Sequence, residues 1–407
     1  GFGTATTNSS AAVNAIADGM KSTTVDEANT VSITGGGTVT STTANGINAQ
    51  STGVGLINIK TDAGTTITST GGLAGILAQQ TGTGGILIDQ ANGTINAGTD
   101  GIKATTVNNT ITVNTGAGKI SGGISAAGAG IVAKAGGANL VTVNTGTGAV
   151  GAVTPSTKWG IEAQSTGGDA TIHIGTGGVF DGGAFAHTNG GGAATVVANG
   201  NVIDTFGPGL RADAVGGNAT VTVNANKTVT SNSDGIEATT STGLSKVDAG
   251  AGSTITTTGG NGILAQALGA GGTVIVNAFG AIDTATGGTN GVFATTTNGE
   301  VKVNTGAGTI NTGASGIVAN AGGGQNVTVV GGTGAITAAG GFGIQATTVN
   351  GVVDVKTGGA VTGKTGISTS SGTGVTTVTT NGVTTGTAGD GIKSTVTGAG
   401  TLTIITN

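Results

Sequence analysis

The chain has 407 residues, of which 87 are glycine, 2 are proline and none is cysteine. Only 8% of the residues are charged, well below the usual share in globular proteins, and the formal net charge is −5. Glycine without a three-residue period excludes collagen, and the lack of cysteine excludes a disulfide framework and thiolate metal sites. The 13 basic residues are spread along the whole sequence, so we expect no nucleic-acid partner.

The hydrophobic fraction of 36% is too regularly placed for a disordered linker. The apolar runs are only a few residues long, so we expect that this segment does not span a membrane. Because the sequence opens with Gly1 and not with methionine, we interpret it as a processed or excised segment.

The first 18 residues come before the repeat that dominates the rest of the chain. Residues 11–18 read AAVNAIAD, a short stretch with apolar and polar residues mixed. Repeat proteins usually cap the exposed edges of their sheets. We therefore expect residues 1–18 to form an amino-terminal cap, as a short amphipathic turn, or a degenerate coil.

From residue 19 onward a Gly-Ile-x-Ala element recurs. Its full copies begin at Gly46, Gly75, Gly101, Gly130, Gly160, Gly235, Gly262, Gly316 and Gly343. Looser copies begin at Gly19, Gly183, Gly209, Gly291, Gly366 and Gly391. These fifteen starts are 23 to 30 residues apart, with a mean of about 27. Repetition with a period of this length is typical of solenoid proteins.

Each repeat contains two further apolar pieces. The second piece occupies residues 111–114, 141–144, 221–224, 274–277 and 301–304. The third occupies residues 94–96, 119–121, 228–230, 309–311 and 335–337. All three pieces alternate apolar with polar residues, which is the period of a strand with one buried face. Asp-Gly or Asn-Gly pairs such as Asp100-Gly101 often precede the first piece, and we expect them to adopt the left-handed backbone of a sharp corner.

Three short strands and three corners in about 27 residues describe one coil of a parallel β-helix. We predict an all-β fold, a right-handed parallel β-helix of about 15 coils with three strands per coil, continuous over residues 19–407. An antiparallel sandwich is the alternative fold. It predicts no fixed phase along the whole chain, and the repeat therefore disfavours it.

Stacked coils align identical positions into ladders. We expect one inward ladder of isoleucines, formed by Ile47, Ile76, Ile102, Ile131 and Ile161. The asparagines that end the second piece should occupy one position of the repeat and form short amide ladders at a corner: Asn114, Asn144, Asn224, Asn277 and Asn304. Residues 401–404 read as an ordinary second strand with no visible cap, so we expect this end to stack on another copy or on further coils.

Several of these features together resemble a known family. The Gly-Ile-x-Ala starts, the Val-Thr-Val-Asn-Thr-Gly-x-Gly segment at residues 141–148 and a similar one at 301–308 resemble the passenger regions of bacterial autotransporters. They are also similar to filamentous-haemagglutinin-like surface proteins. The resemblance covers essentially the whole chain. It implies a secreted β-helix that serves as an adhesin or carrier, held at the outer membrane through a region absent here.

Little in the sequence indicates catalysis. The chain has 14 Asp, 4 Glu and one Arg, and many of the acids lie in Asp-Gly corners. His173 and His187 fall in different strands of neighbouring coils, so we expect no metal site or proton relay between them. We predict no catalytic, cofactor-binding or metal-binding residue, no enzyme activity and no cofactor.

The middle residue of each Gly-Ile-x-Ala element should face outward, with its counterparts in the next coils about 5 Å away. Arg211 and Glu237 should then form a surface ion pair. Leu264, Phe293 and Val318 should form an apolar contact stripe for a partner, or a patch that a loop covers.

Two further surface features leave alternatives open. Trp159 stands just before a repeat start, where it either packs at a corner or anchors a ligand. Outward threonines can form an ice-binding face when they align; the candidates are Thr112, Thr142, Thr222 and Thr328, in a column that Lys246, Lys302 and His173 interrupt.

The leading hypothesis is a non-catalytic extracellular or cell-surface protein, a stalk or adhesin that associates with itself, end to end or laterally, or with ligands on a host or cell surface. The first alternative is a carbohydrate-active β-helix enzyme, which would need a groove with three clustered acids. The second alternative is an ice- or surface-binding protein.

Overall fold

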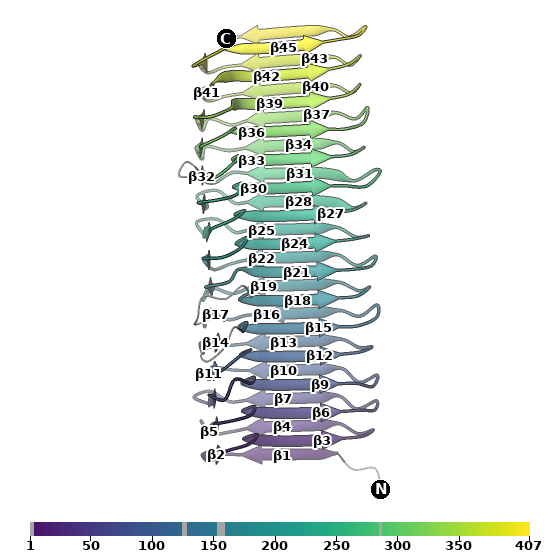
Figure 1. The fold of residues 1–407 in the computed structure, drawn as a ribbon, viewed down its shortest axis with the longest axis vertical. Coiled ribbons are helices and arrows are strands. Elements are labelled where there is room, and N and C mark those ends of the chain that lie inside the picture. Colours follow the sequence, from purple (N-terminus) through teal and green to yellow (C-terminus); the bar gives the residue numbers. More distant parts are fainter. Residues whose placement is uncertain (1–3, 124–127, 153–158, 285–286) are drawn as a thin grey trace. The chain divides into compact units, whose positions relative to one another are not determined.

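The computed structural model describes residues 4–123, 128–152, 159–284 and 287–407. These residues form 46 strands and no helix. The chain divides into two units, Gly1–Phe206 with strands β1 to β23 and Gly207–Asn407 with strands β24 to β46. Within each unit, strands three positions apart in the chain pair in parallel, as β1 with β4 and β4 with β7, which is the connectivity of a β-solenoid (Figure 1). The prediction of a parallel solenoid with three strands per coil and about 15 coils is confirmed.

Unit 1 has three sheets, here named A1, B1 and C1. Sheet A1 consists of β1 (Ala5–Ser9), β4 (Asn29–Ile33), β7 (Ile57–Thr61), β10 (Ile86–Gln90), β13 (Ile111–Thr115), β16 (Val141–Asn144), β19 (Ala170–Ile174) and β22 (Ala194–Ala198). Sheet B1 consists of β2 (Val13–Ala15), β5 (Thr38–Ser41), β8 (Thr66–Ser69), β11 (Thr94–Ala97), β14 (Ile120–Gly122), β17 (Val150–Ala152), β20 (Val179–Phe180) and β23 (Val202–Asp204). Sheet C1 consists of β3 (Met20–Thr24), β6 (Ile47–Ser51), β9 (Ile76–Gln80), β12 (Ile102–Thr106), β15 (Ile131–Ala135), β18 (Ile161–Ser165) and β21 (Ala184–Thr188).

Unit 2 repeats this plan with sheets A2, B2 and C2. Sheet A2 consists of β25 (Ala219–Val223), β28 (Leu244–Ala249), β31 (Thr273–Ala278), β34 (Val301–Thr305), β37 (Val327–Gly331), β40 (Val353–Thr357), β43 (Thr376–Thr380) and β46 (Leu402–Thr406). Sheet B2 consists of β26 (Thr228–Ser231), β29 (Thr254–Thr257), β32 (Ala281–Thr284), β35 (Ile310–Thr312), β38 (Ile336–Ala338), β41 (Val361–Gly363) and β44 (Thr384–Gly386). Sheet C2 consists of β24 (Leu210–Ala214), β27 (Ile236–Thr240), β30 (Ile263–Ala267), β33 (Val292–Thr296), β36 (Ile317–Ala321), β39 (Phe342–Thr348), β42 (Thr365–Ser371) and β45 (Ile392–Val396).

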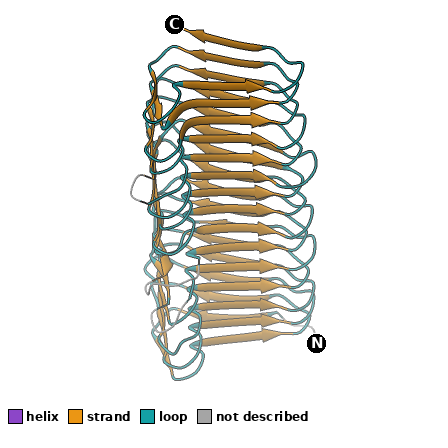
Figure 2. Ribbon diagram, turned by 45° about the horizontal axis from the view of Figure 1, so that its top comes forward, coloured by secondary structure: helices purple, strands orange, loops and turns teal. Residues whose placement is uncertain are grey.

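The core of each unit is built from the alternate residues of these strands. In β13, for example, Ile111 and Val113 are completely buried, while Thr112 and Asn114 between and after them face outward. The predicted isoleucine ladder is confirmed: its members pair coil to coil in the Cα register and none is exposed, namely Ile47, Ile76, Ile102, Ile131 and Ile161. Loops join the strands at the corners between sheets (Figure 2).

Residues 1–18 contribute strands of their own. Strand β1 pairs with β4 over five residues, from Ala5 with Asn29 to Ser9 with Ile33. Strand β2 pairs with β5, and Val13 lies opposite Val39. The single continuous β-helix over residues 19–407 stays a prediction.

The glycine that opens each C-sheet strand has a different role from the one we expected. The left-handed glycines among the described residues include Gly64 (φ 79°) and Gly252 (φ 72°), which lie at other corners, whereas Gly46 and its equivalents are not left-handed. A Cβ atom on Gly46 would clash with Ile67 Cγ2 and lie 2.7 Å from the carbonyl oxygen of Gly75 in the next coil. The prediction of a left-handed corner is therefore wrong, because glycine is needed there for close approach between coils.

The Asp or Asn before this glycine joins the coils by hydrogen bonds. The Oδ1 atom of Asp18 accepts hydrogen bonds from the backbone N and from the Nδ2 of Asn45, both at 3.0 Å. In unit 2 the backbone N of Asn261 donates to Asp234 Oδ1 at 2.6 Å, and the Nδ2 of Asn290 donates to Asn261 Oδ1 at 3.0 Å. These corner residues thus bind the equivalent residue of the next coil.

Substitution of Gly46 by alanine tests the close approach. We expect Gly46→Ala to destabilise the protein by about 1–3 kcal/mol, because the added methyl group overpacks the contact with Ile67 and Gly75. The control is Gly191→Ala, since a Cβ on Gly191 would meet nothing within 4 Å. Urea unfolding measures both variants, and equal effects would contradict the steric explanation.

Candidate functional site

The outward column of each C sheet has the order that the repeat predicts. In C2 the residues that pair from coil to coil are Arg211, Glu237, Leu264, Phe293, Val318, Gln345, Ser368 and Lys393. In C1 they are Lys21, Asn48, Leu77, Lys103, Val132, Glu162 and Phe185. Each column therefore brings together side chains that lie about one repeat apart in the sequence.

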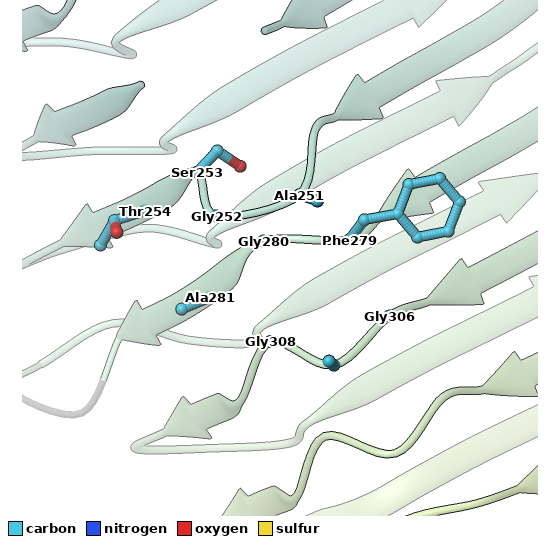
Figure 3. A pocket seen from close by; sticks show the side chains of 10 residues that line it. Ala251, Gly252, Ser253, Thr254, Phe279, Gly280, Ala281, Gly306 and Gly308 are labelled. Atoms are coloured by element: carbon cyan, nitrogen blue, oxygen red, sulfur yellow. The ribbon is translucent and has the colours of Figure 1, made fainter. Parts of the chain in front are cut away.

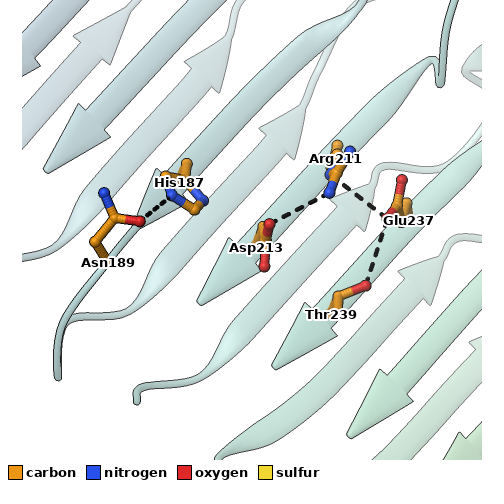
Figure 4. Close-up of polar contacts among 6 residues, drawn as sticks. All are labelled: His187, Asn189, Arg211, Asp213, Glu237 and Thr239. Atoms are coloured by element: carbon orange, nitrogen blue, oxygen red, sulfur yellow. Dashed lines mark hydrogen bonds and ion pairs between the residues drawn. The ribbon is translucent and has the colours of Figure 1, made fainter. Parts of the chain in front are cut away.

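The charged part of the C2 column is a small network around Arg211 (Figure 4). Arg211 Nε lies 3.4 Å from Glu237 Oε1, and Arg211 Nη2 lies 3.3 Å from Asp213 Oδ2. The hydroxyl of Thr239 donates to Glu237 Oε1 at 3.5 Å. The side chain of Glu237 is only 12% exposed, so this ion pair is more buried than an ordinary surface pair. Sequence analysis missed Asp213, although its position two residues after Arg211 places it on the same face of β24.

Burial raises the pKa of the Glu237 carboxyl above its ordinary value. The positive charge of Arg211 acts in the opposite direction, whereas the negative charges of Asp234 and Asp213 add to the rise. The hydrogen bond from Thr239 lowers the pKa. The balance makes Glu237 a carboxyl group that holds its proton more tightly in the folded chain than in the unfolded chain.

This raised pKa predicts a pH dependence of stability. Above the unfolded pKa of about 4.5, the folded state binds more protons at Glu237 than the unfolded state does, so the contribution of this group to stability falls as the pH rises through the folded pKa. Glu237→Gln lacks this loss. We expect the free energy of unfolding of the variant, relative to the natural sequence, to increase between pH 4.5 and neutral pH in a series of urea titrations. Parallel pH profiles for the two proteins would contradict the shift.

The predicted contact stripe is contiguous in the structure, but its members differ in burial. Leu264 pairs with Phe293 and Phe293 pairs with Val318 in the Cα register of C2. Leu264 and Phe293 are half-buried, whereas Val318 is 6% exposed. A partner on this face would therefore touch mainly Leu264 and Phe293, and the role of the stripe as a contact surface stays a prediction.

The outward face of C1 carries aromatic rings. The rings of Trp159 and Phe185 stack with a centroid distance of 4.9 Å and an interplanar angle of 29°. The ring of His187 lies 5.4 Å from that of Phe185, and His187 Nε2 lies 2.5 Å from Asn189 Oδ1 (Figure 4). His173 lies in β19 of sheet A1, so the two histidines stand on different sheets, as the sequence predicts.

Short amide ladders run across the A sheets, and each ends on a carboxylate. In A1, Asn144 Nδ2 donates to Asn114 Oδ1 at 2.8 Å, and Asn114 Nδ2 donates to Asp89 Oδ1 at 2.6 Å. In A2 the same chain of donors runs from Asn304 to Asn277 at 2.8 Å and from Asn277 to Asp248 at 2.6 Å. The predicted amide pairs are confirmed, although they lie within the strands and not at a corner. The two aspartates were missed, because the repeat was aligned by its asparagines alone.

Three assignments to these columns are wrong. Asn224 does not share the position of Asn277, because Thr222 pairs with Asp248 and Asp248 with Asn277. Thr222 therefore belongs to the amide column and not to the threonine column.

Strand β25 enters the sheet two residues earlier than the sequence pattern suggested.

In A1, His173 pairs with Asn144, so His173 does not interrupt the threonine column. The threonine column there is continuous over four coils: Thr112, Thr142, Thr171 and Thr195.

Reversal of one ladder bond tests its contribution. Asn114→Asp sets a carboxylate against Asp89, and we expect it to destabilise the protein by about 1 kcal/mol at neutral pH, since like charges face each other. The double variant Asp89→Asn with Asn114→Asp restores one donor and one acceptor, and should recover most of the loss. Urea unfolding of the three proteins measures this, and additive losses in the double variant would refute the ladder bond.

A groove lies in unit 2 at the turns between sheets A2 and B2 (Figure 3). It has a volume of about 540 Å³ and is lined mainly by glycine, alanine and Phe279, which is 43% exposed. Ligand sites usually need several polar groups that fix the orientation of the ligand. The hydroxyl-bearing Ser253 and Thr254 are the polar side chains that this lining offers, so the groove indicates no particular ligand.

Among the described residues, no group of three or more His, Cys, Asp or Glu side chains is arranged to hold a metal ion. The described part of the chain also contains no helix with the length and apolar character needed to cross a membrane. Comparison of the chain with protein-family models, with curated proteins and with solved structures gives no match.

Proposed function

We propose that this chain is a non-catalytic extracellular structural and adhesive protein, a passenger-type stalk or adhesin. The observation that supports this proposal is the ladder organisation of the outward faces. In both units the same outward position carries matched polar side chains in successive coils, as in the Asn114–Asn144 and Asn277–Asn304 pairs. Each coil contacts mainly its neighbours, so a solenoid can present many surface positions without altering its core.

The resemblance to autotransporter passenger regions supports a location at the cell surface. The Gly-Ile-x-Ala starts that carry the resemblance are the residues that open the C-sheet strands, and Ile47 and Ala49 are completely buried. The proposal includes secretion and attachment to the outer membrane through a region outside these 407 residues.

Self-association is part of the proposal. Leu402 and Ile404 of β46 pair in register with Thr376 and Val378, which are buried inward residues of β43. In β46 the same positions are 43% and 45% exposed. A further coil or a second copy stacked on β46 would bury them, since the free edge of a parallel sheet offers both hydrogen bonds and an apolar face.

A carbohydrate-active enzyme is the second candidate, and one observation favours it. Asp213 and Glu237 share the guanidinium group of Arg211, and the pKa of Glu237 is raised. A carboxyl group with a raised pKa close to a second carboxyl group is the kind of pair that glycoside hydrolysis uses. Arg211 forms an ion pair with both carboxyl groups and so holds them in place within the face of the sheet, and we therefore place the structural role first.

Adhesion is the direct test. Beads coated with the purified chain should adhere to cultured epithelial cells and clump with one another more than beads coated with albumin, and Glu237→Gln should adhere equally well. Electron micrographs of the same preparation should show particles that lengthen with concentration, and Ile404→Lys should shorten them, because a charge blocks the apolar edge.

Beads that neither adhere nor clump would contradict the proposal. Release of reducing ends from polysaccharides by the natural chain, abolished in Glu237→Gln, would establish the enzyme instead.

A further inference from the structure

One corner of unit 1 carries a much larger side chain than the equivalent corners of the other coils. The residue before the glycine of each C1 strand is, in chain order, Asp18, Asn45, Ala74, Asp100, Ala129, Trp159 or Gly182. Asp18, Asn45 and Asp100 each accept a hydrogen bond from the backbone of the next coil. The indole of Trp159 contains no hydrogen-bond acceptor atom, and it is the largest side chain of the series. The other coils place Asp, Asn, Ala or Gly at this position, so an aromatic residue there is a candidate for a functional role.

Trp159 is also part of the aromatic cluster on C1. The sequence contains one Trp, seven Phe and no Tyr, yet Trp159 and Phe185 stack against each other and His187 lies beside them. Both Trp159 and Phe185 are half-buried, so each residue keeps part of its surface in contact with solvent. Aromatic rings that keep an exposed apolar surface next to polar groups are typical of binding surfaces.

A polar groove adjoins this cluster on the same face. It has a volume of about 180 Å³ and is lined by Asp100, Lys103, Val132, Lys134 and Glu162. Glu162, which lines the groove, pairs in register with Phe185, so the groove and the stacked rings lie on neighbouring strands of the same face.

The charges of the groove are paired with one another. Lys134 Nζ lies 2.7 Å from Glu162 Oε1, and Lys103 Nζ lies 3.9 Å from Asp100 Oδ2. Two ammonium groups and two carboxylates leave the groove without a net charge. An anionic ligand would need an excess of cations, which the groove lacks, whereas a neutral ligand with many hydroxyl groups can donate to the carboxylates and accept from the lysines.

We propose that this face of C1, from Lys103 to Trp159 and Phe185, binds a neutral sugar unit of a glycan. The hydroxyl groups of the sugar bind Glu162 and Lys134, and its apolar C–H surface packs on the exposed part of the indole. The inference rests on the proposed adhesive function, because it names the class of ligand that the adhesive surface would recognise.

The single tryptophan allows a direct measurement on the whole chain, since its fluorescence reports on this site alone. Titration with neutral tetrasaccharides of glucose, mannose and xylose should change the emission of Trp159 in a saturable way for at least one of them. Glu162→Gln should weaken that binding about tenfold or more, because a hydrogen bond to a charged group is lost. Trp159→Phe should abolish retardation of the protein in gels that contain the corresponding polysaccharide.

The matched control is a second Lys–Glu pair in unit 2, where Lys302 Nζ lies 3.0 Å from Glu300 Oε2. Glu300→Gln should leave the titration unchanged. Binding of tetragalacturonate or a heparin tetrasaccharide alone would overturn the assignment to a neutral sugar. Coated beads that adhere to cells while no sugar affects Trp159 would refute this site and leave the adhesive function standing. A sugar that changes the emission of Trp159 while the beads do not adhere would support this site and contradict the adhesive function.

Discussion

The structure depends on how closely successive coils approach at one corner. At Gly46 the backbone lies so near the carbonyl oxygen of Gly75 and the side chain of Ile67 that no Cβ atom fits. This contact sets the start of each C-sheet strand, and the alternation along the strand then decides which residues face inward. The isoleucine ladder and the outward columns both follow from it, because a strand that starts one residue later would turn its buried face to solvent.

The C sheets could be predicted in detail because a recurring glycine marks their register, whereas the A sheets carry no such mark. Strand β25 shows the consequence: Val221-Thr222-Val223-Asn224 looks like Val141-Thr142-Val143-Asn144, but pairing places it two residues out of step. A shift of two residues leaves every side chain on the same face of a strand, so the alternation of apolar and polar residues cannot detect it.

The burial of side chains on the outward faces could not be predicted from the sequence either. Neighbouring coils are about 4.8 Å apart, so a long side chain covers the one stacked on it. Glu237 between Arg211 and Leu264 is 12% exposed, and Val318 beside Phe293 is 6% exposed, although both point away from the core. The flat face thus acts as a partly desolvated surface, which explains why the pKa of Glu237 is raised there.

In this repeat, the positions that serve stacking can be distinguished from the positions that could serve binding. Most positions are occupied by whatever residue stacks well on its equivalent one coil away, so agreement with the repeat says little about binding. Departures carry more information, because each one forfeits a ladder contact. Trp159 places an indole at a corner where the other C1 coils have Asp, Asn, Ala or Gly, and the register of C1 places Phe185 beside Glu162 on the same face. A solenoid can add such a site in a single coil without disturbing the others, since each coil packs mainly against its immediate neighbours.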